Sequence, residues 1–98
     1  MDVIAKVITV NPMTSRTYTD EKGQEQTIIS KGFVLQAPHD KFYAEAIGEH
    51  AVKLDKQEFY TDSLYACSIS MNCKPAKTQN GETFMRNNFV LRSINKFN

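Results

Sequence analysis

A chain of 98 residues has room for one domain around one modest hydrophobic core, so we expect residues 1–98 to form a single domain. Hydrophobic residues make up 41% of the chain, which is too many for a disordered protein, and no apolar run reaches the roughly 18 residues needed to cross a membrane. The net charge of +1 excludes a strongly basic protein, but the charge is uneven. From Ser63 onward the charged residues are Lys74, Lys77, Arg86, Arg92 and Lys96 against Glu82 alone.

The first half of the chain predicts three strands. Residues 3–10, 27–37 and 41–47 are rich in β-branched and aromatic residues and are bounded by turn-forming residues. Residues 13–26 are polar, and we expect a long loop or a mobile hairpin there. Gly32 lies inside the second strand, where a glycine is typical of a bulge or a sharp bend.

Alternation in the third strand separates a core face from a solvent face. Phe42, Ala44 and Ala46 share one face, whereas Tyr43 and Glu45 share the other. The two alanines leave room for one large neighbour in a small core. We therefore expect Phe42 to point into the core and Tyr43 to point outward.

The second half predicts one short helix and two more strands. Residues 49–59 have a helical composition, with Ala51 and Leu54 three apart, and one to three turns are expected. Residues 64–73 and 84–94 read as strands joined by a hairpin at Asn80-Gly81. Five strands with one helix between the third and the fourth predict an all-β fold, the five-stranded OB-fold Greek-key barrel.

The two cysteines indicate a reducing compartment. Cys67 and Cys73 are six residues apart on one face of a strand, which separates them by about 20 Å at ~3.3 Å per residue. This is too far for a disulfide, so we expect two reduced core thiols. The chain begins Met1-Asp2 and then enters its first expected strand, without a basic segment and an apolar segment before it, so we expect a cytoplasmic protein.

Catalytic and metal-binding patterns are missing from the sequence. There is no nucleophile elbow and no glycine-rich phosphate loop. His39, His50, Cys67 and Cys73 have no short metal-ligand spacing. We expect no enzymatic activity, no metal and no cofactor.

Aromatic and basic residues indicate binding of single-stranded DNA. Proteins that hold single strands combine a positive groove for phosphates with aromatic faces on which bases stack. The stacking candidates, which lie outside the expected core, are Tyr18, Tyr43 and Phe84. The candidates for phosphate contacts are Arg16, Lys31, Lys74, Lys77 and Arg86. The open alternative is an OB-like adaptor that binds a protein partner and no nucleic acid, which the near-neutral charge favours.

Three segments carry a family resemblance. FYAEAIGEHAVKL (residues 42–54) resembles the third strand, glycine and short helix of bacterial single-stranded DNA-binding proteins. The segment from Ser63 to Ile94 is similar to their fourth strand, basic hairpin and fifth strand, and also to the primosomal replication protein N branch. GFVLQA (residues 32–37) is similar to their second strand.

The resemblance implies an OB-fold homodimer or homotetramer that coats single-stranded DNA in replication, recombination or transfer. Two positions differ from the family pattern: Ile47 stands where an aromatic residue is frequent, and Pro75-Ala76 stands where a tryptophan is frequent. A minimal phage or plasmid type fits these differences, and the small dimeric binders of filamentous phages are a nearby alternative with the same function.

Overall fold

The computed structural model describes residues 1–97 and contains six strands and one helix in that range. In chain order these are β1 (Asp2–Val10), β2 (Thr14–Thr19), β3 (Glu25–Gln36), β4 (Lys41–Ile47), α1 (Glu49–Asp55), β5 (Leu64–Lys77) and β6 (Thr83–Lys96). The fold is all-β with one short helix, as the sequence predicts. Within the same range, no helix is long and apolar enough to span a membrane.

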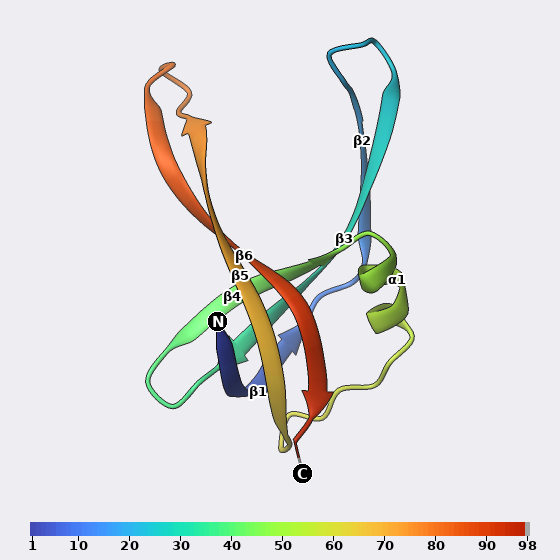
Figure 1. Cartoon of the computed structure of the whole chain (residues 1–98), viewed down its shortest axis with the longest axis vertical. Coiled ribbons are helices and arrows are strands. Elements are labelled where there is room, and N and C mark those ends of the chain that lie inside the picture. Colours follow the sequence, from blue (N-terminus) through green and yellow to red (C-terminus); the bar gives the residue numbers. More distant parts are fainter. Residues whose placement is uncertain (98) are drawn as a thin grey trace.

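Five of the strands form one sheet that closes on itself (Figure 1). The order around the ring is β1-β5-β6-β4-β3, and pairing of β1 with β3 closes it. All of these pairings are antiparallel except β4 with β6, which is parallel and meets at Glu45 and Val90. β2 extends the sheet beyond β3 and lies outside the ring.

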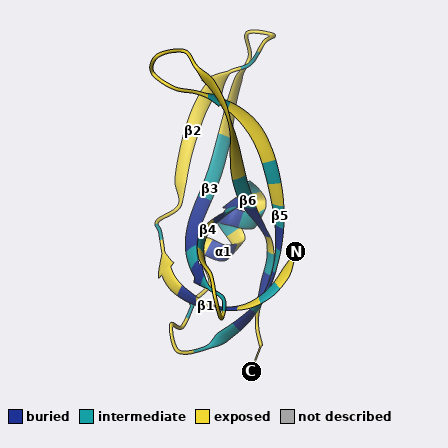
Figure 2. Cartoon of the chain, turned by 90° about the vertical axis from the view of Figure 1, so that its left-hand side faces the viewer, coloured by how far each residue is buried: buried dark blue, intermediate teal, exposed yellow. Residues whose placement is uncertain are grey.

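The hydrophobic core fills the ring, and Figure 2 shows the buried residues gathered there. Phe33, Leu35, Tyr65, Ile69 and Leu91 are at most 1% exposed, and each lies on the inward face of its strand. Further fully buried members are Ala5, Val7, Ala44, Ala46 and Ala51. The small alanines of β4 allow the larger rings and branched side chains opposite them to fill the interior.

Helix α1 is shorter than the expected segment and is anchored by two different contacts. Gly48, with φ of 69°, precedes it, and Ala51 and Leu54 are its buried residues. Lys31 lies on the inward face of β3, and its Nζ donates hydrogen bonds to Asp55 Oδ1 at 2.8 Å and to Asn11 O at 2.9 Å. Lys31 therefore ties the end of α1 to the end of β1.

The polar segment 13–26 forms a hairpin, which is one of the two structures expected for it, and its strand β2 raises the expected count of five strands to six. β2 pairs with the first half of β3 from Thr14–Ser30 to Thr19–Glu25. The turn is closed by Asp20, whose Oδ1 accepts from the backbone N–H groups of Lys22 and Gln24 at 2.9 Å each. The bond from Gln24 lowers the pKa of Asp20. Both faces of β2 are exposed, so its sequence has no apolar alternation by which to recognise a strand.

Two hairpins project from the same end of the ring (Figure 1). The N-terminal arm consists of residues 14–30, and the C-terminal arm consists of residues 71–89. Beyond Ile69, β5 leaves the ring, and so Met71 is 61% exposed although it continues the inward face. For the same reason Cys73 is exposed and the expectation of two core thiols is wrong for it, whereas Cys67 is buried; both are free.

The need for glycine at position 32 does not come from a β-bulge, which is one of the expectations for it. The β3–β4 pairing continues through Gly32 without a register shift, and the bulge on β1 lies between Val7 and Thr9. A Cβ at Gly32 would collide with the hydroxyl and ring atoms of Tyr43. Glycine is required because the Tyr43 ring lies directly over the β3 backbone.

Candidate functional site

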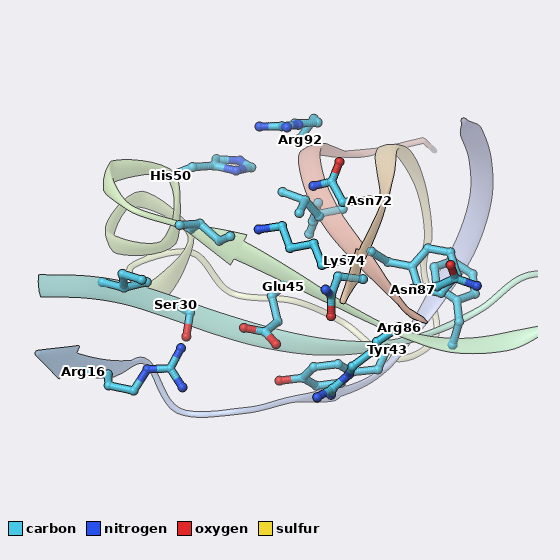
Figure 3. A pocket seen from close by; sticks show the side chains of 17 residues that line it. Arg16, Ser30, Tyr43, Glu45, His50, Asn72, Lys74, Arg86, Asn87 and Arg92 are labelled. Atoms are coloured by element: carbon cyan, nitrogen blue, oxygen red, sulfur yellow. The ribbon is translucent and has the colours of Figure 1, made fainter. Parts of the chain in front are cut away.

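A groove of about 870 Å³ lies between the two arms, with β4 along its floor (Figure 3). Its polar and charged lining residues are Arg16, Ser30, Glu45, His50, Asn72, Lys74, Arg86, Asn87, Asn88 and Arg92. Its apolar and aromatic lining residues are Ile28, Phe42, Tyr43, Ile47, Phe89, Val90 and Leu91. The groove is thus made by segments far apart in the sequence, which the ring closure brings together.

The floor of the groove is the outward face of β4. Tyr43, Glu45 and Ile47 alternate with the buried Ala44 and Ala46. The Tyr43 side chain is 46% exposed, although one side of its ring covers Gly32. The ring is held against the sheet and leaves its other side to the groove, so it is a preformed surface for a flat apolar group.

The C-terminal arm places two pairs of polar residues on the groove. Lys74 lies directly opposite Arg86, and Asn72 lies directly opposite Asn88, so each pair shares a face of the sheet. Like charges at opposed positions repel each other and destabilise a bare hairpin. An anion bound between Lys74 and Arg86 would relieve this repulsion.

A bulge in β6 adds a third cation from the same side. Ser68 pairs with Ser93 and Ile69 pairs with Leu91, which leaves Arg92 as an extra residue in β6. Its side chain is directed outward, and its Nε donates a hydrogen bond to Ser70 Oγ at 3.0 Å. This hydrogen bond positions the guanidinium at the groove, where Figure 3 shows it near His50 and Asn72.

The N-terminal arm forms the opposite side of the groove. Arg16 lies opposite Ile28 in the β2–β3 pairing, and both line the groove together with Ser30. Tyr18 is two residues further along β2 and therefore shares the face of Arg16, nearer the arm tip. It is 45% exposed.

The cations of the groove have no carboxylate partner among residues 1–97. Within residues 1–97 the only salt bridge joins Lys31 to Asp55, which leaves Arg16, Lys74, Arg86 and Arg92 without one. Glu45 is the only acidic residue among those that line the groove, and it is also unpaired in that range. The groove therefore carries a net positive charge in a protein that is nearly neutral overall.

Half of the site residues expected from the sequence line this groove. They are Arg16, Tyr43, Lys74 and Arg86. Tyr18 and Phe84 lie on the groove-facing sides of the two arms but further out, since Phe84 pairs with Ala76 on the face of Lys74. Each arm thus carries an arginine and, two residues nearer the tip, an exposed aromatic ring.

The other two expected residues lie elsewhere. Lys77 pairs with Thr83 on the face of the C-terminal arm that is turned away from Lys74. Lys31 is 6% exposed and is held by Asp55, so its ammonium group is not free to contact a phosphate. Its alternation with Phe33 and Leu35 places it on the inward face of β3, a signal already present in the sequence.

Sequence reasoning missed several groove residues. Asn87 and Asn88 stand in the middle of a strand, where asparagine is unfavourable, and this is a usable signal of a functional role. Asn72 is two residues before Lys74 in β5 and lies on the same face, so the sequence pattern that identifies Lys74 also predicts Asn72 as a groove residue. The sequence does not predict Arg92 as a groove residue, because the outward direction of its side chain depends on the bulge in β6.

The described residues contain no cluster that could hold a metal ion, and of the two free thiols only Cys73 is exposed. Residues 1–97 contain no group of three or more His, Cys, Asp or Glu side chains that could hold a metal ion. Burial raises the pKa of the Cys67 thiol to about 11, so at neutral pH it is neither a nucleophile nor a ligand. The groove combines cations that have no salt bridge within residues 1–97, amide groups and an exposed aromatic ring, and this set of side chains suits binding of a ligand with anionic and flat apolar parts.

Comparison of the chain with known protein families, with curated proteins and with solved structures found no match in any of the three.

Proposed function

We propose that this chain is a non-catalytic protein that binds single-stranded DNA in the groove between its two arms. One observation carries the proposal. The groove contains both an exposed aromatic ring, which packs on one side against the sheet, and a set of cations that have no acidic partner among residues 1–97. The ring is Tyr43, and the cations are Arg16, Lys74, Arg86 and Arg92. Base stacking and phosphate contacts are the two interactions by which proteins hold single strands.

We also propose that the closed sheet is an OB-fold barrel. Leaving β2 aside, the ring has five strands, and α1 falls between its third and fourth, which is the OB arrangement. OB-folds bind oligonucleotides on their second and third strands and with the loops after the first and the fourth. The corresponding parts here are β3, β4, the N-terminal arm and the C-terminal arm, and these line the groove.

The floor of the groove favours unpaired bases over a duplex. Stacking on Tyr43 requires a base whose face is free, and the bases of a duplex are already stacked on each other. Phosphates would follow the cations on the arms, while bases turn towards Tyr43 and the amide groups of Asn72 and Asn88. A duplex could contact the cations of the arms with its phosphates but could not stack a base on Tyr43.

A salt titration tests the proposal. A labelled single strand of mixed sequence and the duplex of the same sequence are titrated with the protein at several salt concentrations. Four phosphate contacts predict a slope of log affinity against log salt of about −3 for the single strand, at roughly −0.7 per contact. Equal affinity for the two forms would indicate unspecific charge attraction, and absence of binding would favour the protein-adaptor alternative.

We infer further that the chain acts in DNA replication, recombination or transfer as a homodimer or homotetramer. Two features support self-association. Within residues 1–97, β2 pairs with β3 alone and leaves one strand edge open, and the outward side of β1 exposes Ile4 and Ile8, each 39% accessible. Sedimentation is expected to give a multiple of 11.2 kDa at about 10 μM or above. A sharp monomer peak would contradict it.

A further inference from the structure

Glu45 is the one groove residue whose charge opposes phosphate binding. It is half-buried on the floor, two residues from Tyr43 on the same face of β4. Figure 3 shows its carboxylate in the middle of the lining, between Arg16 and Ser30 on one side and Lys74 on the other. No hydrogen bond or salt bridge to its side chain occurs within residues 1–97.

The place of this carboxylate relative to Tyr43 fixes what it can contact. Residues two apart on one face of a strand are about 6–7 Å apart. A base stacked on the Tyr43 ring therefore reaches Glu45 with its edge. The phosphates are drawn to the cations of the arms and are repelled from this point, so the group that meets Glu45 is a base edge.

We propose that Glu45 makes the groove select bases that carry an exocyclic amino group; this rests on the proposed binding of single-stranded DNA. An ionised carboxylate only accepts hydrogen bonds, and the amino groups of cytosine, adenine and guanine are donors. Thymine and uracil present carbonyl oxygens on both sides of their single N–H. Those oxygens repel a carboxylate.

The sharpest test compares oligo(dC) with oligo(dU) of equal length at neutral pH. The two bases have the same ring size and no methyl group, and they differ in the amino or carbonyl group at position 4 and in the protonation of N3. The protein is expected to bind labelled oligo(dC) about tenfold more tightly than labelled oligo(dU), the effect of one hydrogen bond to a charged acceptor.

Glu45→Gln removes the selection without removing the side chain. An amide both donates and accepts, so this variant is expected to bind the two oligonucleotides with nearly equal affinity and to melt close to the original protein. Glu82→Gln is the matched control. Glu82 is exposed at the tip of the C-terminal arm, and only its backbone takes part in the turn. The control makes the same change of charge and is expected to keep the tenfold ratio.

The outcomes separate this inference from the function on which it rests. Equal binding of both oligonucleotides by the original protein, or an unchanged ratio in Glu45→Gln, would overturn the role of Glu45 and leave single-strand binding intact. Absence of binding to either oligonucleotide would overturn both.

Discussion

Tyr43 and Phe42 are neighbours in β4, and their side chains lie on opposite faces of the strand. Phe42 is half-buried, packs against the core and has its ring 5.7 Å from that of Phe89. Tyr43 is exposed on the groove floor. Phe42→Ala is expected to cost about 2–3 kcal/mol of stability, below the full cost of a buried ring. Tyr43→Ala is expected to weaken single-strand binding by about 1–3 kcal/mol per stacked base and to change stability much less.

Thermal melts and oligonucleotide titrations of the two variants check this pair. An early melt of Tyr43→Ala combined with normal binding would mean that Tyr43 acts through its contact with Gly32 and not through stacking.

Lys31 stabilises the fold, and we expect it to make no contact with single-stranded DNA. Its ammonium is buried, and Asp55 neutralises it across 2.8 Å. Asp55→Ala leaves the buried charge with the carbonyl of Asn11 alone and is expected to destabilise the protein by about 2 kcal/mol, a reduced value because Asp55 is 39% exposed. Lys31→Met removes the charge and keeps the volume, and it is expected to cost less. Chemical denaturation measures both, and a loss of oligonucleotide affinity in folded Lys31→Met would place Lys31 in the site after all.

At the scale of elements, the C-terminal arm has one charged face turned to the groove and another turned away. Lys74 and Lys77 are three residues apart in β5 and lie on opposite faces. Lys74→Gln is expected to reduce the salt slope for single-stranded DNA by about 0.7, the effect of one lost phosphate contact, and Lys77→Gln is expected to leave it unchanged. Equal effects of the two variants would mean that the arm acts only through its total charge.

The two cysteines differ in burial because Cys67 lies in the part of β5 that belongs to the ring and Cys73 lies in the C-terminal arm. Cys73 is exposed on the arm, whereas burial raises the pKa of Cys67 from 9.0 to about 11. A thiol reagent at pH 8 is therefore expected to modify Cys73 quickly and Cys67 only after unfolding. The unfolded Cys67 thiol ionises at lower pH than the folded one, so stability is expected to fall as the pH rises from about 9 to about 11. Labelling of both thiols at equal rates in the folded protein would contradict the burial of Cys67.

At the scale of the whole molecule, the sequence predicts the ring better than the arms. The strands of the ring alternate between core and solvent, so their existence and the inward direction of Phe33 and Leu35 follow from the pattern. Both arms lie outside the core. Their alternation is not marked by burial, so the polar sequence of β2 does not distinguish a strand from a loop, and the sequence around Cys73 does not distinguish an exposed thiol from a buried one.

Local sequence patterns predict some of the groove residues, whereas others depend on contacts between distant segments. Tyr43 follows from the buried alanines beside it, and Lys74 and Arg86 follow from the basic hairpin. Glu45 and Arg92 gain their importance from distant segments: the closure of β4 against β6 and the bulge in β6. Such long-range pairings are not visible in any local stretch of sequence.

Amide chemical-shift mapping during titration with a mixed-sequence oligonucleotide tests whether single-stranded DNA lies in the groove between the arms. The largest shifts are expected at Arg16, Tyr43, Lys74 and Asn88, with little change along the outward side of β1 around Ile4. Shifts concentrated on that side of β1, or none at saturating oligonucleotide, would mean that single-stranded DNA does not bind between the arms.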